Sequence, residues 1–121
     1  MALACDILIA TEHARLGLPE PGVGVVAATT GGVHRLAKRM PLSIAMGYIL
    51  TGKDMAAQEA YRWGIVNEEV PLPDLMPTAH RWTNEILECS PLAVRASKQC
   101  AVMGVGVTLD EALAKRYPAL K

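Results

Sequence analysis

Residues 16–32 read LGLPEPGVGVVAATTGG and contain one charged side chain, the carboxylate of Glu20. Prolines stand on both sides of it, at Pro19 and Pro21. A proline fixes φ and has no backbone N–H to donate, so it disfavours both a helix interior and a strand ladder. We therefore predict that Glu20 stands on a rigid turn and not within a sheet.

Four glycines follow the carboxylate: Gly22, Gly24, Gly31 and Gly32. Glycine permits a positive φ and lets the backbone approach another group closely. A helix that begins near residues 28–31 would present unpaired N–H groups and the positive end of its dipole. A fixed carboxylate beside that end suits acid–base chemistry next to a developing negative charge. The alternative is an ordinary surface turn, in which the acid is only a partner of the helix dipole.

The candidate site follows from this stretch. Glu20 is the candidate catalytic residue, and the backbone around it supplies candidate substrate-binding positions: Pro19, Gly22, Gly24, Ala28 and Thr29. No metal site is expected, because His13 and His80 have no acidic or cysteine partner at metal-ligand spacing.

The hydrophobic pattern on either side predicts an α/β chain with two or three short strands followed by five or six helices. The strands are expected within residues 6–11, 14–18 and 65–70, and the helices begin near residues 28–31, 41, 55, 73, 90 and 108. Pro41 is expected at the first helical position, and Asp54 as the cap of a helix over residues 55–63. Thr108 and Glu111 have the spacing of a capping box. So little sheet cannot complete an α/β core, which indicates a piece of a larger fold.

Composition excludes several classes of protein. The chain has 121 residues, of which 51% are hydrophobic, and 12 basic residues balance 12 acidic ones. Such a chain is neither disordered nor attracted electrostatically to nucleic acid or to an anionic membrane. No apolar run approaches the roughly 18 residues of a membrane span. Three cysteines without CxxC spacing predict buried free thiols in a reducing compartment. A cytoplasmic location is expected, with mitochondria and peroxisomes as the alternatives.

An ordered set of short motifs resembles the crotonase (enoyl-CoA hydratase/isomerase) superfamily. The motifs are ACDI at residues 4–7, ARLGLPE at 14–20, GGVHRL at 31–36, LTG at 50–52, AQEA at 57–60 and WGIVN at 63–67. The run at residues 62–67 and the Leu-Pro-Glu resemble carnitinyl-CoA dehydratase-type members most. The resemblance covers nearly the whole chain.

The resemblance implies a partial ββα-superhelix, an acyl-CoA thioester as substrate, and a homotrimer or hexamer in the full-length protein. It implies that Glu20 corresponds to the second of two catalytic glutamates, the one that moves the α-proton during hydration or dehydration. No cofactor is implied, because coenzyme A is part of the substrate. Lys38, Arg39 and Lys53 are either contacts for its phosphates or solvated helix ends.

The same resemblance implies that this chain is the C-terminal half of a longer protein. The first glutamate and the oxyanion-hole segment of the family lie just before the residue that aligns with Met1. Residues 1–70 would then belong to the crotonase-like core, and residues 71–121 to an incomplete helical C-terminal region. Residues 27–32 read AATTGG where the family has a slightly shorter Pro-x-Ala-Gly-Gly. The expected activity is that of an acyl-CoA hydro-lyase, inactive in isolation. The alternatives are an isomerase or a truncated, non-catalytic subunit that packs with full-length partners.

Overall fold

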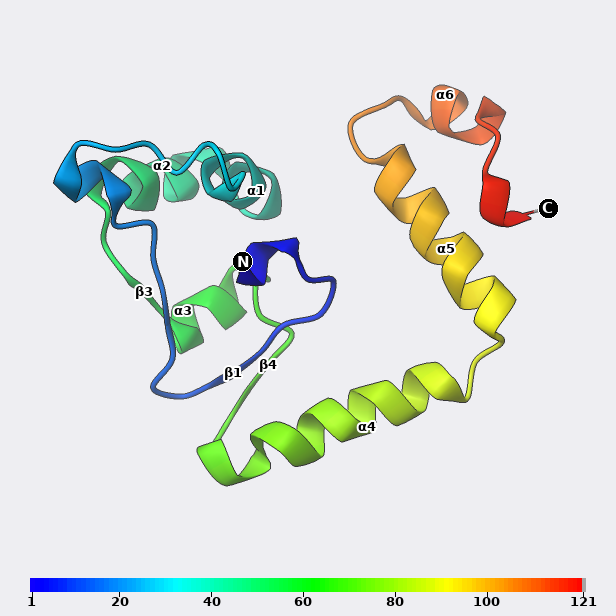
Figure 1. Ribbon diagram of the computed structural model, residues 1–121, viewed down its shortest axis with the longest axis horizontal. Helices are drawn as coiled ribbons and strands as arrows, with labels where there is room; N and C mark the ends of the chain where they lie inside the picture. The colour runs from blue at the N-terminus through cyan, green and yellow to red at the C-terminus, as the bar shows by residue number, and fades with distance from the viewer. Residues whose placement is uncertain (121) are drawn as a thin grey trace. The chain divides into compact units, whose positions relative to one another are not determined.

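A computed structural model describes residues 1–120. The chain is mixed α/β, as predicted (Figure 1). Its strands are β1 (Ile9–Thr11), β2 (Arg15–Leu16), β3 (Met55–Ala56) and β4 (Glu68–Val70). Its α-helices are α1 (Gly32–Arg39), α2 (Leu42–Thr51), α3 (Ala57–Arg62), α4 (Leu75–Leu87), α5 (Pro91–Gly104) and α6 (Leu109–Ala114). Short 3₁₀ turns are η1 (Ala2–Ala4), η2 (Glu20–Val23), η3 (Leu72–Asp74) and η4 (Pro118–Leu120).

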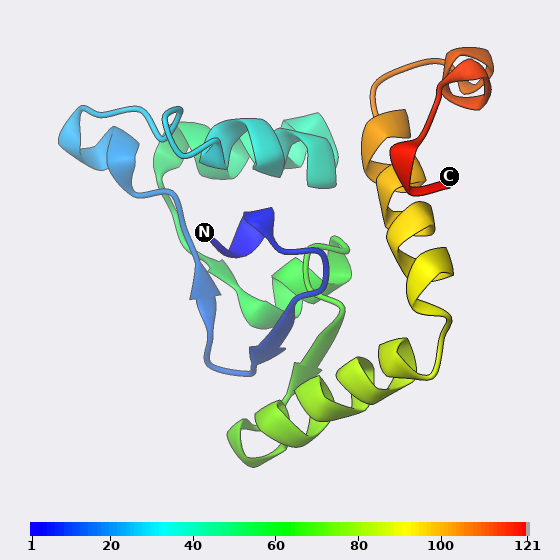
Figure 2. The same cartoon turned by 45° about the vertical axis from the view of Figure 1, so that its right-hand side comes forward.

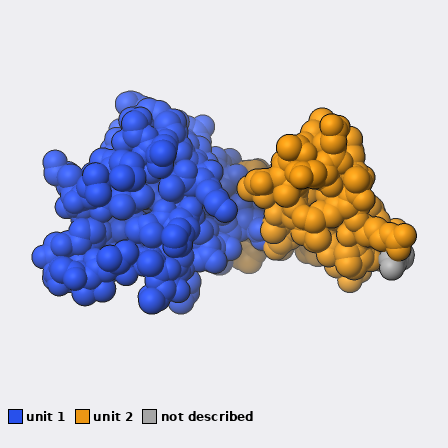
Figure 3. Space-filling model, turned by 90° about the horizontal axis from the view of Figure 1, so that it is seen from above, with its two compact units in different colours: residues 1–78 blue, residues 79–121 orange. Residues whose placement is uncertain are grey.

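Contacts divide the chain into two compact units, which Figure 3 colours separately. The first is Met1–Thr78 and the second starts at Ala79, so the division falls inside α4. The domain boundary expected after residue 70 stays a prediction.

Two small sheets, each of two strands, organise the first unit. Strand β1 pairs in parallel with β4, and β2 pairs antiparallel with β3 (Figure 2). Asn67 holds the start of the parallel pair, because its side-chain oxygen accepts from the Leu8 N–H at 2.9 Å and its own N–H donates to the Leu8 carbonyl at 2.7 Å. Both pairs join segments that lie more than 35 residues apart in the sequence.

The strand β3 corrects one predicted element. Residues 55–63 were expected to form a single helix capped by Asp54, but Met55 and Ala56 are extended and Ala56 is the N-cap of α3. Tertiary pairing explains the difference, since Leu16 takes Met55 as its partner across β2 and β3. Helical periodicity in a short segment cannot compete with a strand pairing that also buries Met55 to 2% exposure.

Small and medium apolar residues form the core of the first unit. The cluster of buried side chains consists of Ala10, Leu36, Met40, Ala45, Met55, Ala57, Ala60, Ile65 and Val66. Helix α2 begins one residue later than expected, because Pro41 is its N-cap with ψ of 131° and not its first helical residue. The extended ψ places Pro41 just before the helix. At that position the proline ring has no preceding helical turn to clash with.

The second unit consists of α5, α6 and η4 together with the end of α4. Ser90 is the N-cap of α5 with Pro91 at its first position, and Thr108 and Glu111 form the predicted capping box of α6. Side chains join these elements: the Ala119 N–H donates to Gln99 at 2.7 Å, and the Tyr117 hydroxyl donates to the Ala112 carbonyl at 2.6 Å.

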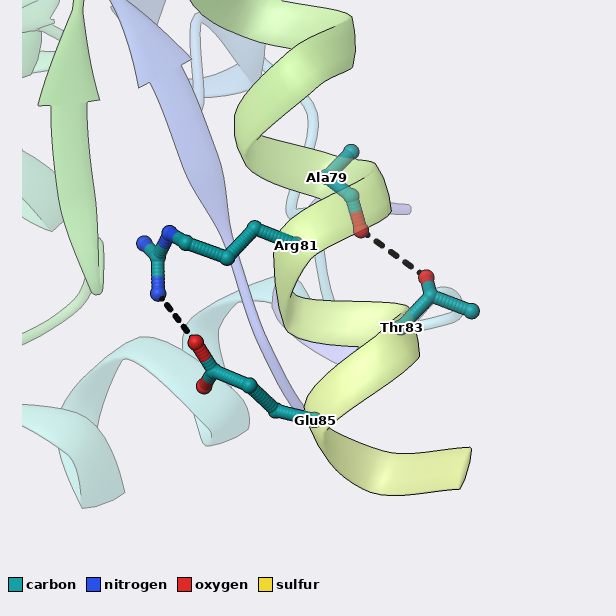
Figure 4. A network of polar contacts seen from close by, with 4 residues as sticks. All are labelled: Ala79, Arg81, Thr83 and Glu85. Carbon is teal, nitrogen blue, oxygen red and sulfur yellow. Dashed lines mark hydrogen bonds and ion pairs between the residues drawn. The ribbon is translucent and has the colours of Figure 1, made fainter. Parts of the chain in front are cut away.

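Helix α4 carries contacts between residues four apart (Figure 4). Arg81 Nη1 lies 2.8 Å from Glu85 Oε1, and the Thr83 hydroxyl donates to the Ala79 carbonyl at 2.8 Å. The two charged side chains are about half exposed, at 46% and 53%, so their pairing adds little stability.

Two further expectations concern the whole chain. Within residues 1–120, no helix combines the length and the apolar character needed to cross a membrane.

The cysteines are free, as expected, but Cys5 and Cys89 are exposed and Cys100 is half-buried, so the prediction of buried thiols was wrong. Cys5 follows η1 and Cys89 follows the end of α4, so both lie in connecting segments, which usually run over the surface whatever their sequence neighbours are.

Candidate functional site

The Glu20 turn is a 3₁₀ turn whose geometry follows from its prolines and glycines. Pro19 is the N-cap of η2, and the Gly22 N–H donates to the Pro19 carbonyl at 3.0 Å. Gly24 ends the turn in the left-handed region at φ = +76°, where a side chain would be strained. The Val25 N–H then donates to the Glu20 carbonyl at 3.0 Å. The backbone of Glu20 is therefore fixed on both sides, as the sequence predicted.

The side chain of Glu20 has an unsatisfied oxygen. Its Oε2 atom is buried and finds no hydrogen-bond partner in the part of the chain that the structure describes. Most buried polar atoms in folded proteins have a partner, so an orphaned carboxylate oxygen marks either strain or a functional group. This oxygen has no hydrogen bond that a substrate group would first have to displace.

A cavity of about 320 Å³ lies beside Glu20, entirely within the first unit. Its walls come from η1, from residues 15–18 and Glu20, from the start of α1 and from the segments around Tyr48, Met55 and Ile65. The polar and charged side chains on these walls are Arg15, Glu20, Thr30, Arg35, Tyr48 and Lys53. Glu20 is thus the one carboxylate among the described lining residues.

The start of α1 forms one wall of the cavity through Thr30 and Gly32. The helix begins at Gly32 with Gly31 as its N-cap at φ = +71°, just after the residues where its start was expected. Arg35 fixes the preceding turn, because its Nη1 donates to the Thr30 carbonyl at 2.7 Å. The turn before α1 is therefore held by a side chain from that helix.

The other predicted contacts lie elsewhere on the same turns. Pro19, Gly22 and Gly24 build η2, and Ala28 and Thr29 are exposed in the turn before α1; none of the five is among the described residues that border the cavity. Their role in binding stays a prediction. Lys53 does border the cavity, whereas Arg39 donates to the Cys5 carbonyl at 2.6 Å.

Sequence reasoning missed three lining side chains, Arg15, Arg35 and Tyr48. Tyr48 had a detectable signal, since it is the one hydroxyl-bearing aromatic in the mostly apolar helix α2. Its interaction with the Glu59 carboxylate, aided by burial, raises the pKa of Tyr48 to about 12. The phenol consequently stays neutral throughout the physiological pH range.

A family described as enoyl-CoA hydratase/isomerase matches residues 1–119. The chain belongs to this family. A carnitinyl-CoA dehydratase from Proteus mirabilis is 43% identical over 99 residues, which cover 82% of this chain and 38% of that protein. A short-chain-enoyl-CoA hydratase from Clostridium acetobutylicum is 40% identical over 114 residues, which cover 94% of this chain and 43% of the relative.

Solved structures of the family share the fold. The enoyl-CoA hydratase from Bacillus anthracis superposes with a TM-score of 0.88 at 36% identity, covering 92% of this chain and 43% of that one. The chain therefore spans less than half the length of these relatives, in sequence and in structure. The described residues contain no group of three or more His, Cys, Asp or Glu side chains placed to hold a metal ion.

Proposed function

We propose that this chain supplies the Glu20 half of an active site that adds water to, or removes it from, the C2=C3 bond of an acyl-CoA thioester. The observation that supports this most directly is the buried, unpartnered Oε2 of Glu20 at the edge of the 320 Å³ cavity. A proton-transfer group must be positioned and unoccupied before the substrate arrives, and this oxygen meets both conditions.

The proposed step moves one proton at C2. In dehydration the Glu20 carboxylate accepts the C2 proton, the C2–H electron pair becomes the C2=C3 bond, and the C3 hydroxyl leaves as water with a proton from a second carboxyl group. Hydration is the reverse. Negative charge develops on the thioester oxygen meanwhile, and backbone N–H donors would stabilise it. By family resemblance, the second carboxyl group and those donors come from the half of the fold that this chain does not span.

The remaining expectations belong to the same proposal. The substrate carries the coenzyme A, so no separate cofactor is proposed. A homotrimer or hexamer is the proposed assembly of the full-length protein, and the cytoplasm is its proposed location. No observation favours an isomerase over a hydro-lyase.

A non-catalytic subunit that packs with full-length partners is the alternative to this proposal. The reading frame upstream of Met1 separates the two candidates. Codons for Gly-Gly-Gly-x-Glu just before Met1 would support the enzyme, and a stop codon there would support the non-catalytic subunit.

The experiment uses the completed protein, by which we mean this chain preceded by the upstream half from its own reading frame or from the Clostridium acetobutylicum relative. Hydration of crotonyl-CoA is followed by steady-state kinetics. We expect Glu20→Gln to lower kcat by about 10²–10⁴, the usual contribution of a positioned acid or base. KM should change little, because the amide keeps the shape of the carboxylate.

Two controls accompany this variant. Glu12→Gln makes the same change at an exposed residue outside the cavity and should leave kcat unchanged. The 121-residue chain alone should show no turnover. If Glu20→Gln keeps the kcat of the parent, Glu20 has no part in the chemistry.

A further inference from the structure

The Glu20 turn is the first part of a longer surface loop, residues 19–31, whose two ends meet. The residues that flank the loop, Leu18 and Gly32, are so close that a Cβ on Gly32 would lie 2.8 Å from Leu18 Cδ2. Carbon atoms in contact are usually about 3.5–4.0 Å apart, so the closure leaves no room for a side chain at residue 32. A compact loop whose ends are this close is an Ω-loop, and Glu20 lies near its start.

Ala27 fills the inside of the loop where it closes. It is 4% exposed, whereas Val25 and Val26 just before it are 56% and 67% exposed. A Cβ on Gly32 would lie 3.4 Å from the Ala27 carbonyl oxygen and 3.6 Å from the Ala27 Cβ. Leu18 and Ala27 therefore close on the same point of Gly32, and we call these three residues the loop base.

Leu18 has contacts on other sides that limit its movement. Its side chain packs against the buried core cluster. Its carbonyl oxygen would lie 3.5 Å from a Cβ on Gly52, at the end of α2. Pro19, with its fixed φ, is the only residue between Leu18 and Glu20, so a shift of Leu18 is passed on to the carboxylate and not absorbed on the way.

The start of α1 is also held in place. The Gly31 N–H donates to the Ala28 carbonyl at 2.9 Å, and Arg35 Nη1 donates to the Thr30 carbonyl at 2.7 Å. Leu36, on the same helix, is buried in the core. A side chain at residue 32 would therefore displace Leu18 more readily than the helix.

We propose that Gly32 is a positioning residue for Glu20: because it has no side chain, the loop base closes, and the closed base sets the position of the Glu20 carboxylate. This inference rests on the proposed function, because it takes Glu20 to be the group that transfers the proton. Proton transfer is sensitive to such a position, since a misplacement of about 1 Å can lower a rate by about 10²-fold.

The first test adds one methyl group to the loop base of the completed protein. Gly32→Ala should lower kcat for crotonyl-CoA by about 10–10²-fold. The dissociation constant of butyryl-CoA, measured by titration calorimetry, should stay as in the parent, whereas a methyl group that collided with the substrate would raise it. Gly47→Ala is the matched control, because it makes the same change inside α2, where a Cβ meets nothing within 4 Å, and it should leave kcat unchanged.

Two double-mutant cycles separate positioning from a general loss of structure. Leu18→Ala removes the Cδ2 atom that the new methyl group would meet, so Gly32→Ala should lower kcat less in that background than in the parent. In the Glu20→Gln background Gly32→Ala should lower kcat no further, because the group that it positions is already gone. Additive effects in both cycles, or a lower melting temperature with an unchanged kcat, would refute the role of Gly32.

Crystal structures of the completed protein give a readout that does not depend on turnover. The Glu20 carboxylate of Gly32→Ala should be displaced by about 1 Å from its place in the parent. If it keeps its place, the role of Gly32 is refuted while the hydratase proposal stands. If Glu20→Gln keeps the kcat of the parent, the proposed function fails, and the displacement still decides whether Gly32 positions this side chain.

Leu18→Ala keeps the proposal testable if Gly32→Ala does not fold. It loosens the loop base from the other side without adding an atom, so it should also displace the Glu20 carboxylate. An unmoved carboxylate in Leu18→Ala would show that the loop base does not position Glu20.

Discussion

At the scale of single residues, Glu20 combines an unsatisfied buried oxygen with the catalytic role that we propose for it. A buried polar atom without a partner costs about 1–3 kcal/mol, and nothing in the described chain compensates Oε2. The turn keeps the carboxylate there all the same, because Pro19, Pro21 and Gly24 restrict the backbone to one path. Such unfavourable arrangements persist mainly where activity requires them.

Two glycines of α2 should respond in opposite directions to the same substitution. Gly52 ends the helix at φ = +65°, so Gly52→Ala forces a side chain into the left-handed region and should cost about 1–2 kcal/mol of stability. Gly47 lies inside the helix with open space where a Cβ would be, so Gly47→Ala should stabilise by about 0.5–1 kcal/mol. Denaturant unfolding of the completed protein measures both. Equal effects of the two variants would contradict the backbone explanation.

At the scale of elements, the capping box of α6 should make that helix sensitive to pH. The Thr108 N–H donates to Glu111 Oε2 at 2.9 Å, the Glu111 N–H donates to the Thr108 hydroxyl at 3.3 Å, and the bonds from Thr108 lower the pKa of Glu111. A lowered pKa in the folded state means that the ionised form stabilises the helix above the ordinary carboxyl pKa of 4.5. This stabilisation is lost as the pH falls through the lowered value.

We therefore expect the helical ¹³Cα shifts of residues 109–114 to decrease as the completed protein is acidified from pH 6 to pH 3. Glu111→Gln keeps an acceptor for the Thr108 N–H and removes the titrating group, so its helical shifts should vary less over this range. Asp110→Asn removes a charge from the same turn without altering the capping box, and it should preserve the decrease. A pH-independent α6 in the parent would contradict the role of Glu111.

At the scale of the whole chain, unpartnered surface predicts poor stability in isolation. Large apolar side chains are exposed around η2 and along one side of α2: Val23, Val25, Val26, Leu42, Met46 and Leu50. Each sheet of the described chain has only two strands, so its outer edges are unpaired and open to association with other chains.

We accordingly expect the 121-residue chain expressed alone to aggregate or to unfold without a sharp transition. Circular dichroism during heating and size-exclusion chromatography measure this, with the completed protein as the control that should melt cooperatively. A monomer with a sharp and reversible transition would show that the chain buries enough surface by itself.

The sequence by itself determined the features that depend on neighbouring residues. Proline and glycine chemistry fixed the turn at Glu20, the helix end at Gly52 and the start of α5 at Pro91, and the Thr-x-x-Glu spacing fixed the capping box. These features have local causes, so one sequence is enough to find them. The ordered motifs also identified the family, because motifs are compared along the sequence without knowledge of the fold.

Only the tertiary structure decided what depends on distant residues. The pairing of Leu16 with Met55 turned the start of an expected helix into a strand. The cavity brings together Glu20, Arg35 and Tyr48 from separate elements. Apolar periodicity predicts which face of an element is buried. It does not predict which other element packs against that face, because the fold decides this. Residues of the site that carry no local signature could be found only once the chain was folded.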